Sequence, residues 1–228
     1  MTGILLVGDD AIRQSLFEAA GVVDRVQRVD SLEEAFALRS DRVRAGWAGI
    51  VVDSEHYAEA MRAAELRDGL ASAVGFADTL AFAGSLPGAY AFCARVGGVV
   101  AAFRESMGRD YALTDGAVIG SGPEAWAGLA ALTQVRVSKL TVHAEPFDAV
   151  TPAVAHRLGI EILTADADSF ATAPVIYSAR ELAVILKQPD RGLVIDESVA
   201  LHTVAAQVRL LTSKEPDMKA MRAVIAGT

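Results

Sequence analysis

The stretch that most constrains the fold is residues 117–132, where a β-branched segment, a glycine turn and an apolar helix follow one another. Gly120, Gly122 and Ala125 fall on the pattern G-x-G-x-x-G/A. In that pattern the first glycine permits a tight turn, the second lets the backbone approach a pyrophosphate, and the third small residue lets helix and strand pack closely. The segment therefore predicts a βα turn of the dinucleotide-binding type, with Ser121 inside the candidate cofactor site.

The segments after this turn extend the same pattern. We expect a second strand at 139–143, a helix at 147–158 closed by Gly159, and a third strand at 160–163. Together these elements have the length of a βαβαβ unit.

Two residues in the turn weigh against nucleotide binding. Pro123 has no backbone N–H, so one possible phosphate donor is missing. Glu124 places a negative charge in the first helical turn, where a phosphate would lie. The alternative interpretation is that the glycines close a βα turn that binds no ligand.

Composition excludes several classes of function. The 228 residues are 52% hydrophobic and can form one large domain or two small ones. A net charge of −8 argues against nucleic acid or an anionic membrane as the main partner. No apolar run approaches the roughly 18 residues that cross a bilayer, and acidic residues follow the first apolar run, so we expect a cytoplasmic protein. Cys93 is the only cysteine, which excludes disulfides and cysteine-clustered metal sites, and its apolar context favours a buried thiol.

The first half of the chain also alternates strands with helices. Strands are expected at 3–7, 25–30 and 47–53, and helices at 11–20, after Ser31, and at 55–67. Ser31 and Glu34 have the spacing of a capping box. Two strand-like runs, 77–83 and 89–94, are joined by a glycine- and proline-containing segment that predicts a hairpin. The later elements expected are a helix at 97–107, a strand at 174–177, a helix to about 186, a strand at 192–195, and helices at 198–211 and 218–225. The alternation predicts a largely parallel sheet covered on both faces.

Three further segments resemble the shikimate dehydrogenase family. Residues 200–222 look like that family's C-terminus, a Leu-x-His-Gln-Ala-Ala helix followed by Leu-Trp-Thr-Gly, a proline and a final Met-Arg helix. Residues 73–80, Ala-Val-Gly-Phe-Ala-Asp-Thr-Leu, are similar to its Ala-x-Gly-Ala-x-Asn-Thr-Leu. Residues 46–57 resemble its Gly-Phe-x-Gly-x-Asn-Val-Thr-x-Pro-His-Lys. The tail is the most specific of these segments, and their order and spacing agree throughout.

The resemblance implies an α/β protein of two domains. An N-terminal substrate-type domain with a mixed sheet would span 1–103, and the tail 204–228 would return to it. A Rossmann-like domain with a parallel sheet would span 104–203. The family's activity is NADP-dependent oxidoreduction of shikimate and 3-dehydroshikimate, a step of aromatic amino acid biosynthesis. The resemblance also implies that a small-molecule ligand binds in the interdomain cleft and that the protein is a monomer or a homodimer.

The positions on which the family's catalysis depends are replaced. Its catalytic lysine position is Tyr57 here, and its catalytic aspartate falls on Arg95. His56 could supply acid–base function by another route, since a histidine titrates near neutrality and the neighbouring tyrosine can donate. The alternative is that His56 and Tyr57 are two partly exposed residues at a helix start.

The substrate-binding positions are altered as well. The family's Ser-x-Ser pair is reduced to Ser15, and the asparagine of Asn-Thr-Leu is Asp78, whose charge would repel a carboxylate. The glutamine after the tail histidine is Thr203, and we expect His202 to pack where the tail returns to the first domain.

Cofactor recognition would favour NAD over NADP, with weak affinity for either. Where NADP-dependent members have Asn-Arg-Thr, this chain has His143, Ala144 and Glu145, so no guanidinium meets a 2′-phosphate. Glu145 could bind a ribose hydroxyl or be a solvated loop charge. Asp166 and Asp168 are poor evidence for a metal, and none is expected.

Two classes of function remain at this point. The first is an inactive homologue with a binding or regulatory role. The second is an oxidoreductase on another small hydroxy acid, with NAD and a rebuilt site. The joint loss of the lysine and aspartate positions favours the first class.

Overall fold

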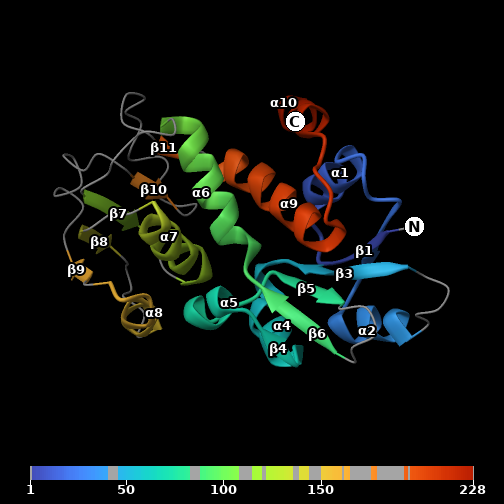
Figure 1. Ribbon diagram of the computed structural model, residues 1–228, viewed down its shortest axis with the longest axis horizontal. Coiled ribbons are helices and arrows are strands. Elements are labelled where there is room, and N and C mark those ends of the chain that lie inside the picture. The colour runs from blue at the N-terminus through green and yellow to red at the C-terminus, as the bar shows by residue number, and fades with distance from the viewer. Residues whose placement is uncertain are drawn as a thin grey trace. The chain divides into compact units, whose positions relative to one another are not determined.

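The computed structural model describes residues 2–40, 46–82, 88–107, 115–119, 122–135, 139–143, 150–160, 162–164, 176–178, 193–194 and 196–227. The chain divides into two compact units, which are described separately (Figure 1). Unit 1 contains Met1–Ala94 and Thr203–Thr228, and unit 2 contains Arg95–His202. The family resemblance implies borders at 103/104 and 203/204, whereas the borders of the two compact units lie at 94/95 and 202/203.

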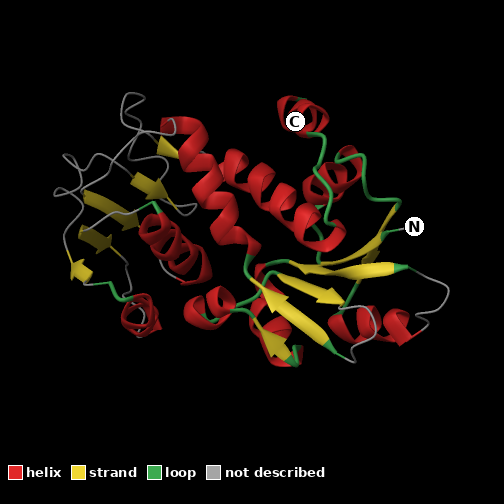
Figure 2. Ribbon diagram, viewed as in Figure 1, coloured by secondary structure: helices red, strands yellow, loops and turns green. Residues whose placement is uncertain are grey.

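Unit 1 is built on a six-stranded sheet in the order β2-β1-β3-β5-β6-β4. The strands are β1 (Gly3–Val7), β2 (Arg25–Val29), β3 (Trp47–Val52), β4 (Leu66–Arg67), β5 (Thr79–Phe82) and β6 (Ala89–Phe92). β1 pairs in parallel with β2 and β3, whereas β5 is antiparallel to both β3 and β6. The sheet is therefore mixed, with the expected hairpin of β5 and β6 next to the parallel strands (Figure 2).

The helices of unit 1 bury apolar faces against this sheet and against each other. They are α1 (Ala11–Ala19), α2 (Leu32–Ser40), α4 (Tyr57–Ala63), α5 (Gly69–Val74), part of α9 (Asp196–Thr212) and α10 (Met218–Ala226). The expected capping box is present at the start of α2. The Glu34 N–H donates to Ser31 Oγ at 3.1 Å, and the Glu34 carboxylate accepts from the Asp30 N–H at 3.0 Å.

The C-terminal helix α10 packs on α1, as the figure shows (Figure 1). The Asp217 N–H donates to the carbonyl of Ala20 at 2.9 Å, and Met221 is fully buried. The Asp217 side chain accepts from the N–H groups of Lys219 and Ala220, both at 3.0 Å, and so caps α10.

The helix expected at 55–67 is wrong at both ends. It begins as a 3-10 turn, Ser54–His56, and α4 ends at Ala63. The next residues turn into β4, which pairs in parallel with β6, and the Glu65 N–H donates to the carbonyl of Ala89 at 3.2 Å. The unpaired edge of the hairpin thus outcompetes helix propensity over these residues.

Two further helices, α5 in unit 1 and α6 at the border to unit 2, start where side-chain carboxylates of unit 1 accept their first N–H groups. α5, which was not expected, begins after Asp68, whose carboxylate accepts from the Ala71 N–H at 2.6 Å, and it ends at Gly75 with φ +83°. α6 (Ala94–Met107) begins three residues earlier than expected, where the Ala94 N–H donates to Asp78.

Unit 2 contains a five-stranded sheet in the order β11-β10-β7-β8-β9, with every pair parallel. The strands are β7 (Asp115–Ile119), β8 (Lys139–His143), β9 (Ile162–Thr164), β10 (Ile176–Ser178) and β11 (Leu193–Val194). Numbered along the chain, this is the order 3-2-1-4-5 of a Rossmann sheet. α7 (Gly122–Gln134) follows β7 and α8 (Val150–Leu158) follows β8, as expected. The helix expected up to about residue 186 lies outside the described residues.

Among the helices of the described ranges, none is both long and apolar enough to cross a bilayer.

Candidate functional site

A buried chain of three polar side chains lies in unit 1. Asp78 is 1% exposed, and its Oδ1 accepts from the Thr79 hydroxyl at 2.6 Å and from the Ala94 N–H at 2.9 Å. The amide Nε2 of Gln207, on α9, donates to Thr79 Oγ1 at 3.2 Å. Asp78 was expected to repel a carboxylate-bearing ligand. In the structure its Oδ1 binds the start of α6 and fixes the Thr79 hydroxyl.

Gln207 leaves one polar atom without a partner. Its residue is 1% exposed, and Oε1 is the one buried side-chain nitrogen or oxygen, among the described residues, that has no hydrogen-bond partner. Buried polar atoms are almost always paired, so an unpaired one requires an explanation. Gln207 was not among the predicted site residues, because the resemblance placed the family's glutamine position on Thr203, four residues earlier.

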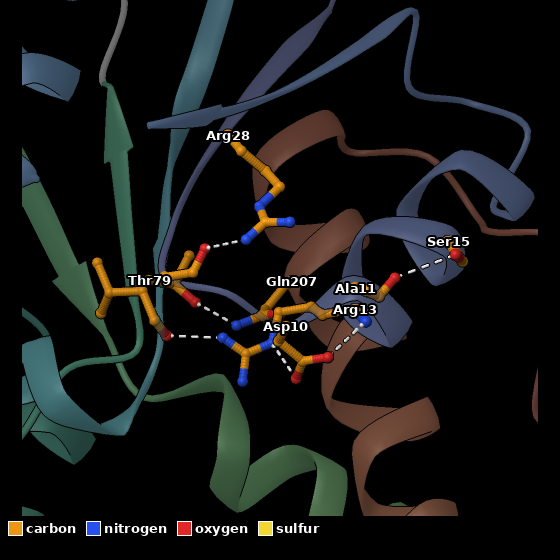
Figure 3. Close-up of polar contacts among 9 residues, drawn as sticks. Asp10, Ala11, Arg13, Ser15, Arg28, Thr79 and Gln207 are labelled. Atoms are coloured by element: carbon orange, nitrogen blue, oxygen red, sulfur yellow. Dashed lines mark hydrogen bonds and ion pairs between the residues drawn. The ribbon is translucent and has the colours of Figure 1, made fainter. Parts of the chain in front are cut away.

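Arg13 reaches the same part of unit 1 from α1. Its Nη1 donates to the carbonyl of Val52 at 2.9 Å, and its Nε lies 3.6 Å from the carboxylate of Asp10. Val51, one residue before, is the strand partner of Thr79. Arg13 and Gln207 therefore contact neighbouring positions of β3 and β5 from two different helices (Figure 3).

Ser15 does not join this cluster. Its hydroxyl donates to the carbonyl of Ala11, one turn back in α1, at 3.0 Å, and the residue is exposed (Figure 3). Arg13, two residues earlier, was not predicted as a site residue, because the family motif at this place in the sequence consists of serines. Thr203 is buried at 7% exposure, one helical turn before Gln207.

Arg28 supplies a second guanidinium near the end of β1. It forms an ion pair with Asp9 and donates to the carbonyl of Gly8 at 3.3 Å. Figure 3 shows the Arg28 side chain. This side chain is more exposed than that of Arg13, at 38% against 21%.

An aspartate–histidine pair follows β3. His56 Nδ1 lies 2.7 Å from Asp53 Oδ1, and each side chain is 23% exposed. Gly8 has φ +121°, and a Cβ there would overlap the Asp53 carboxylate, so only glycine fits. A carboxylate bound to one ring nitrogen fixes the imidazole and leaves the other nitrogen for proton transfer.

Tyr57 differs from the partly exposed residue considered above. It is 4% exposed, and its ring stacks on Phe76 with centroids 4.9 Å apart and planes 20° apart. The position at which the family resemblance places a lysine is thus part of an aromatic contact in the core of unit 1.

In unit 2, Arg95 forms an ion pair with Glu124. The Glu124 Oε2 lies 2.6 Å from Nε and 2.5 Å from Nη2 of Arg95, with side chains 13% and 29% exposed. The Glu124 charge, which was expected to oppose a phosphate, therefore has a cationic partner in the first turn of α7.

The glycine turn is described only in part. Gly122 has φ +75°, and among the described residues outside its own stretch of chain no heavy atom lies within 4 Å of where its Cβ would be, while Ala125 is fully buried. Gly120, Ser121 and Glu145 lie outside the described residues, and His143 is placed only as the last residue of β8.

The remaining candidates do not form a metal site in the described residues. No group of three His, Cys, Asp or Glu side chains lies close enough there to hold a metal ion, and Asp166 and Asp168 fall outside the described ranges. His202, the last residue of unit 2, has its Nε2 2.5 Å from Glu105 on α6. Cys93 is buried, as its apolar context indicated.

A parallel sheet in Rossmann order, in the same chain as a mixed sheet, defines the class of two-unit α/β folds with a Rossmann-type unit. No protein family model and no curated protein matches the sequence.

Solved structures of shikimate and quinate dehydrogenases match the whole chain. Quinate dehydrogenase from Corynebacterium glutamicum, in complex with NAD, has a TM-score of 0.83 at 17% identity over 100% of this chain and 98% of its own. Shikimate dehydrogenase from Mycobacterium tuberculosis has a TM-score of 0.77 at 21% identity, covering 99% and 98%. Shikimate 5-dehydrogenase from Listeria monocytogenes, in complex with shikimate and NAD, has a TM-score of 0.80 at 12% identity, covering 98% and 95%. The chain has the shikimate dehydrogenase fold.

Proposed function

We propose that this chain is a small-molecule-binding protein with a shikimate dehydrogenase fold that has lost shikimate oxidoreduction. The observation that supports this most strongly is the placement of Tyr57, which is buried and stacked on Phe76 at the position where the family resemblance indicates a lysine. The aspartate position is Arg95, a cation bound to Glu124. Neither side chain can act as the amine or the carboxylate of the family's catalytic pair.

The nucleotide that we propose for unit 2 is NAD. Some of the similar solved structures contain NAD and another contains NADP+. In this chain, His143 and Glu145 occupy the positions where a 2′-phosphate would require a guanidinium. Pro123 removes a backbone donor at the pyrophosphate, so affinity should be weak.

Calorimetric titration of NAD and NADP tests this part of the proposal. Wild type should bind NAD more tightly than NADP. Replacing Pro123 with Gly and Glu124 with Ala should tighten NAD binding by about tenfold, since a backbone donor returns and a negative charge near the pyrophosphate is removed. Glu18→Ala, at an exposed position of α1, is the control. If neither protein binds NAD at millimolar concentration, the glycine turn is structural only.

One observation favours a second candidate, a dehydrogenase of another small hydroxy acid with a rebuilt site. The Asp53–His56 pair, at 2.7 Å and partly exposed, is a suitable general base. NADH formation across a panel of hydroxy acids would support this candidate, provided that His56→Asn abolishes it and Asp53→Asn weakens it. If no hydroxy acid in the panel gives NADH, this second candidate is excluded and the binding protein proposed above is retained.

A further inference from the structure

We infer that the ion pair of His202 and Glu105 is a pH-sensitive brace, which holds α9 on α6 while the histidine is charged and loosens as the histidine loses its proton. His202 Nε2, on α9, lies 2.5 Å from Glu105 Oε2, on α6, and the two residues are 97 positions apart in the sequence. The brace requires no ligand, so it is independent of the function proposed above.

The pair joins the two helices in which the chain crosses between the units. α6 and α9 are both labelled in Figure 1. The first crossing, after Ala94, is at the first residue of α6, and the second, after His202, is inside α9. Glu105 and His202 both belong to unit 2, so their contact ties together the helix by which the chain enters this unit and the helix by which it leaves. A change in the strength of that contact therefore acts on both connections at once.

The chemistry of the two groups makes the contact depend on pH. A carboxylate only accepts hydrogen bonds, so His202 Nε2 must carry a proton, in a neutral imidazole or in a charged imidazolium. The imidazolium adds charge attraction, and charge-assisted hydrogen bonds are roughly twice as strong as neutral ones. Histidine side chains generally change charge between about pH 5 and 8, whereas glutamate carboxylates stay ionised down to about pH 4.3. The brace is therefore strongest at about pH 5 to 6 and weakens as the pH rises toward 8.

The surroundings of the pair make it sensitive to this charge. The His202 side chain is 12% exposed, so little water screens it, while Glu105 is 42% exposed. Among the described residues, Glu105 is the one charged side chain within ion-pair distance of His202. The next charges along the two helices are Arg104, beside Glu105, and Glu197 and Arg209 on α9, of which Arg209 pairs with Glu215. The residues one helical turn from His202 on α9, and one turn before Glu105 on α6, are all uncharged: Ser198, Val199, Ala205, Ala206, Ala101 and Ala102.

Hydrogen–deuterium exchange with mass spectrometry tests the brace in the full chain at pH 5.5 and pH 8.0. Peptides from α6 and from the first half of α9 are compared between wild type and Glu105→Gln, which keeps a hydrogen-bond acceptor and removes the charge. The comparison is made at one pH at a time, so the intrinsic exchange rate cancels. Wild type should be protected about two- to fivefold more than Glu105→Gln at pH 5.5, the range expected for a partly exposed ion pair. This ratio should fall close to one at pH 8.0.

Two further comparisons separate the histidine charge from other effects of pH. In a His202→Gln background, Glu105→Gln should change protection by the same factor at both pH values, because the titrating group is gone. Glu215→Gln is the matched control on α9, since its partner Arg209, at 2.7 Å, stays charged throughout. Any loss of protection that Glu215→Gln causes at the end of α9 should therefore be the same at both pH values.

Three results would overturn the inference. A ratio of wild type to Glu105→Gln that is equal at both pH values, whether one or larger, would show a contact whose strength does not depend on the histidine charge. A ratio that rises with pH would show that the charged histidine does not bind the carboxylate. A pH dependence that persists in the His202→Gln background would assign it to another group.

Discussion

At the scale of one residue, the surroundings of Tyr57 predict that it cannot be exchanged for lysine without a loss of stability. Its ring is 4% exposed and stacked on Phe76, so a lysine there would lose the stack and bury an ammonium. We expect Tyr57→Lys to lower the free energy of unfolding by about 2–4 kcal/mol in urea denaturation. Tyr57→Phe, which keeps the ring, should lose clearly less. Equal stability of Tyr57→Lys and wild type would show that the position is not part of the core.

The same reasoning applies to Arg95. In the structure the positive charge of Arg95 attracts the negative charge of Glu124. Arg95→Asp would replace this attraction with repulsion between two carboxylates. We therefore expect the double variant Tyr57→Lys with Arg95→Asp to remain inactive toward shikimate with NAD or NADP. Measurable turnover of this variant, in a spectrophotometric assay of cofactor reduction, would mean that the two substitutions alone had removed the activity.

Glu65 gives a pH-dependent prediction. A hydrogen bond from the Ala89 N–H to its carboxylate, at 2.5 Å, lowers the pKa of Glu65 below its ordinary value of 4.5. A lowered folded-state pKa contributes stability above the unfolded pKa, and this is lost as the pH falls through the folded one. Glu65→Gln should therefore be less stable at pH 7 by about 1 kcal/mol or less, since the site is exposed. The difference should shrink in urea titrations below pH 4.5. If the stability difference between Glu65→Gln and wild type did not change with pH, the charge of Glu65 would not be its cause.

Among the secondary-structure elements, the C-terminal helix α10 packs on α1 and holds the end of the chain against unit 1. Met221 is fully buried, and Asp217 caps the helix and binds Ala20 through its N–H. We expect Met221→Ala to cost about 2–4 kcal/mol in the free energy of unfolding, the usual range for a buried methionine. Lys219→Ala, two residues earlier on the exposed face of α10, should change it by less than about 0.5 kcal/mol. Similar effects of the two substitutions would mean that α10 is not packed as described.

The start of α7 offers a test of the Arg95–Glu124 pair. Single and double replacements of the two residues by alanine form a double-mutant cycle, read out by urea denaturation. Because the pair is partly buried, we expect a coupling energy of about 1 kcal/mol that decreases with added salt. A coupling energy near zero at low salt would show that the pair does not hold Glu124.

The strand and helix pattern was predictable where one signal dominated. β1 and β8 have the bounds that their apolar runs predicted, and the hairpin of β5 and β6 followed from its strand pattern. The predicted secondary structure was wrong where pairing with a strand distant in sequence determined the conformation. Leu66 and Arg67 continue a helical pattern in sequence, but the edge of β6 draws them into a strand.

The candidate site was less predictable than the fold. Asp78 and Tyr57 were selected by their places in motifs, and nothing in those motifs revealed that both are buried. Arg13 and Gln207 were missed because their importance depends on contacts between segments far apart in sequence, 128 residues in the case of Gln207 and Thr79. Spacing within one segment cannot reveal such a contact.

At the level of the whole molecule, unit 1 is discontinuous, and its last segment supplies α10 and Gln207. We expect a chain that ends at residue 203 to lose the cooperative unfolding of unit 1, since the buried contacts of α9 and α10 would be missing. Limited proteolysis followed by mass spectrometry should then show cleavage within residues 2–82. Protection equal to that of the full chain would mean that the tail contributes little to unit 1.

The central claim is that the chain has a shikimate dehydrogenase fold without the family's reaction. The most direct measurement is the reduction of NAD and of NADP by the purified wild-type protein with shikimate or quinate at saturating concentration. We predict no rate above the protein-free background, because the resemblance places the family's catalytic positions on Tyr57 and Arg95, and each of these residues is engaged in a packing or ionic contact. Sustained turnover with either substrate, abolished by heat and proportional to protein concentration, would contradict the claim.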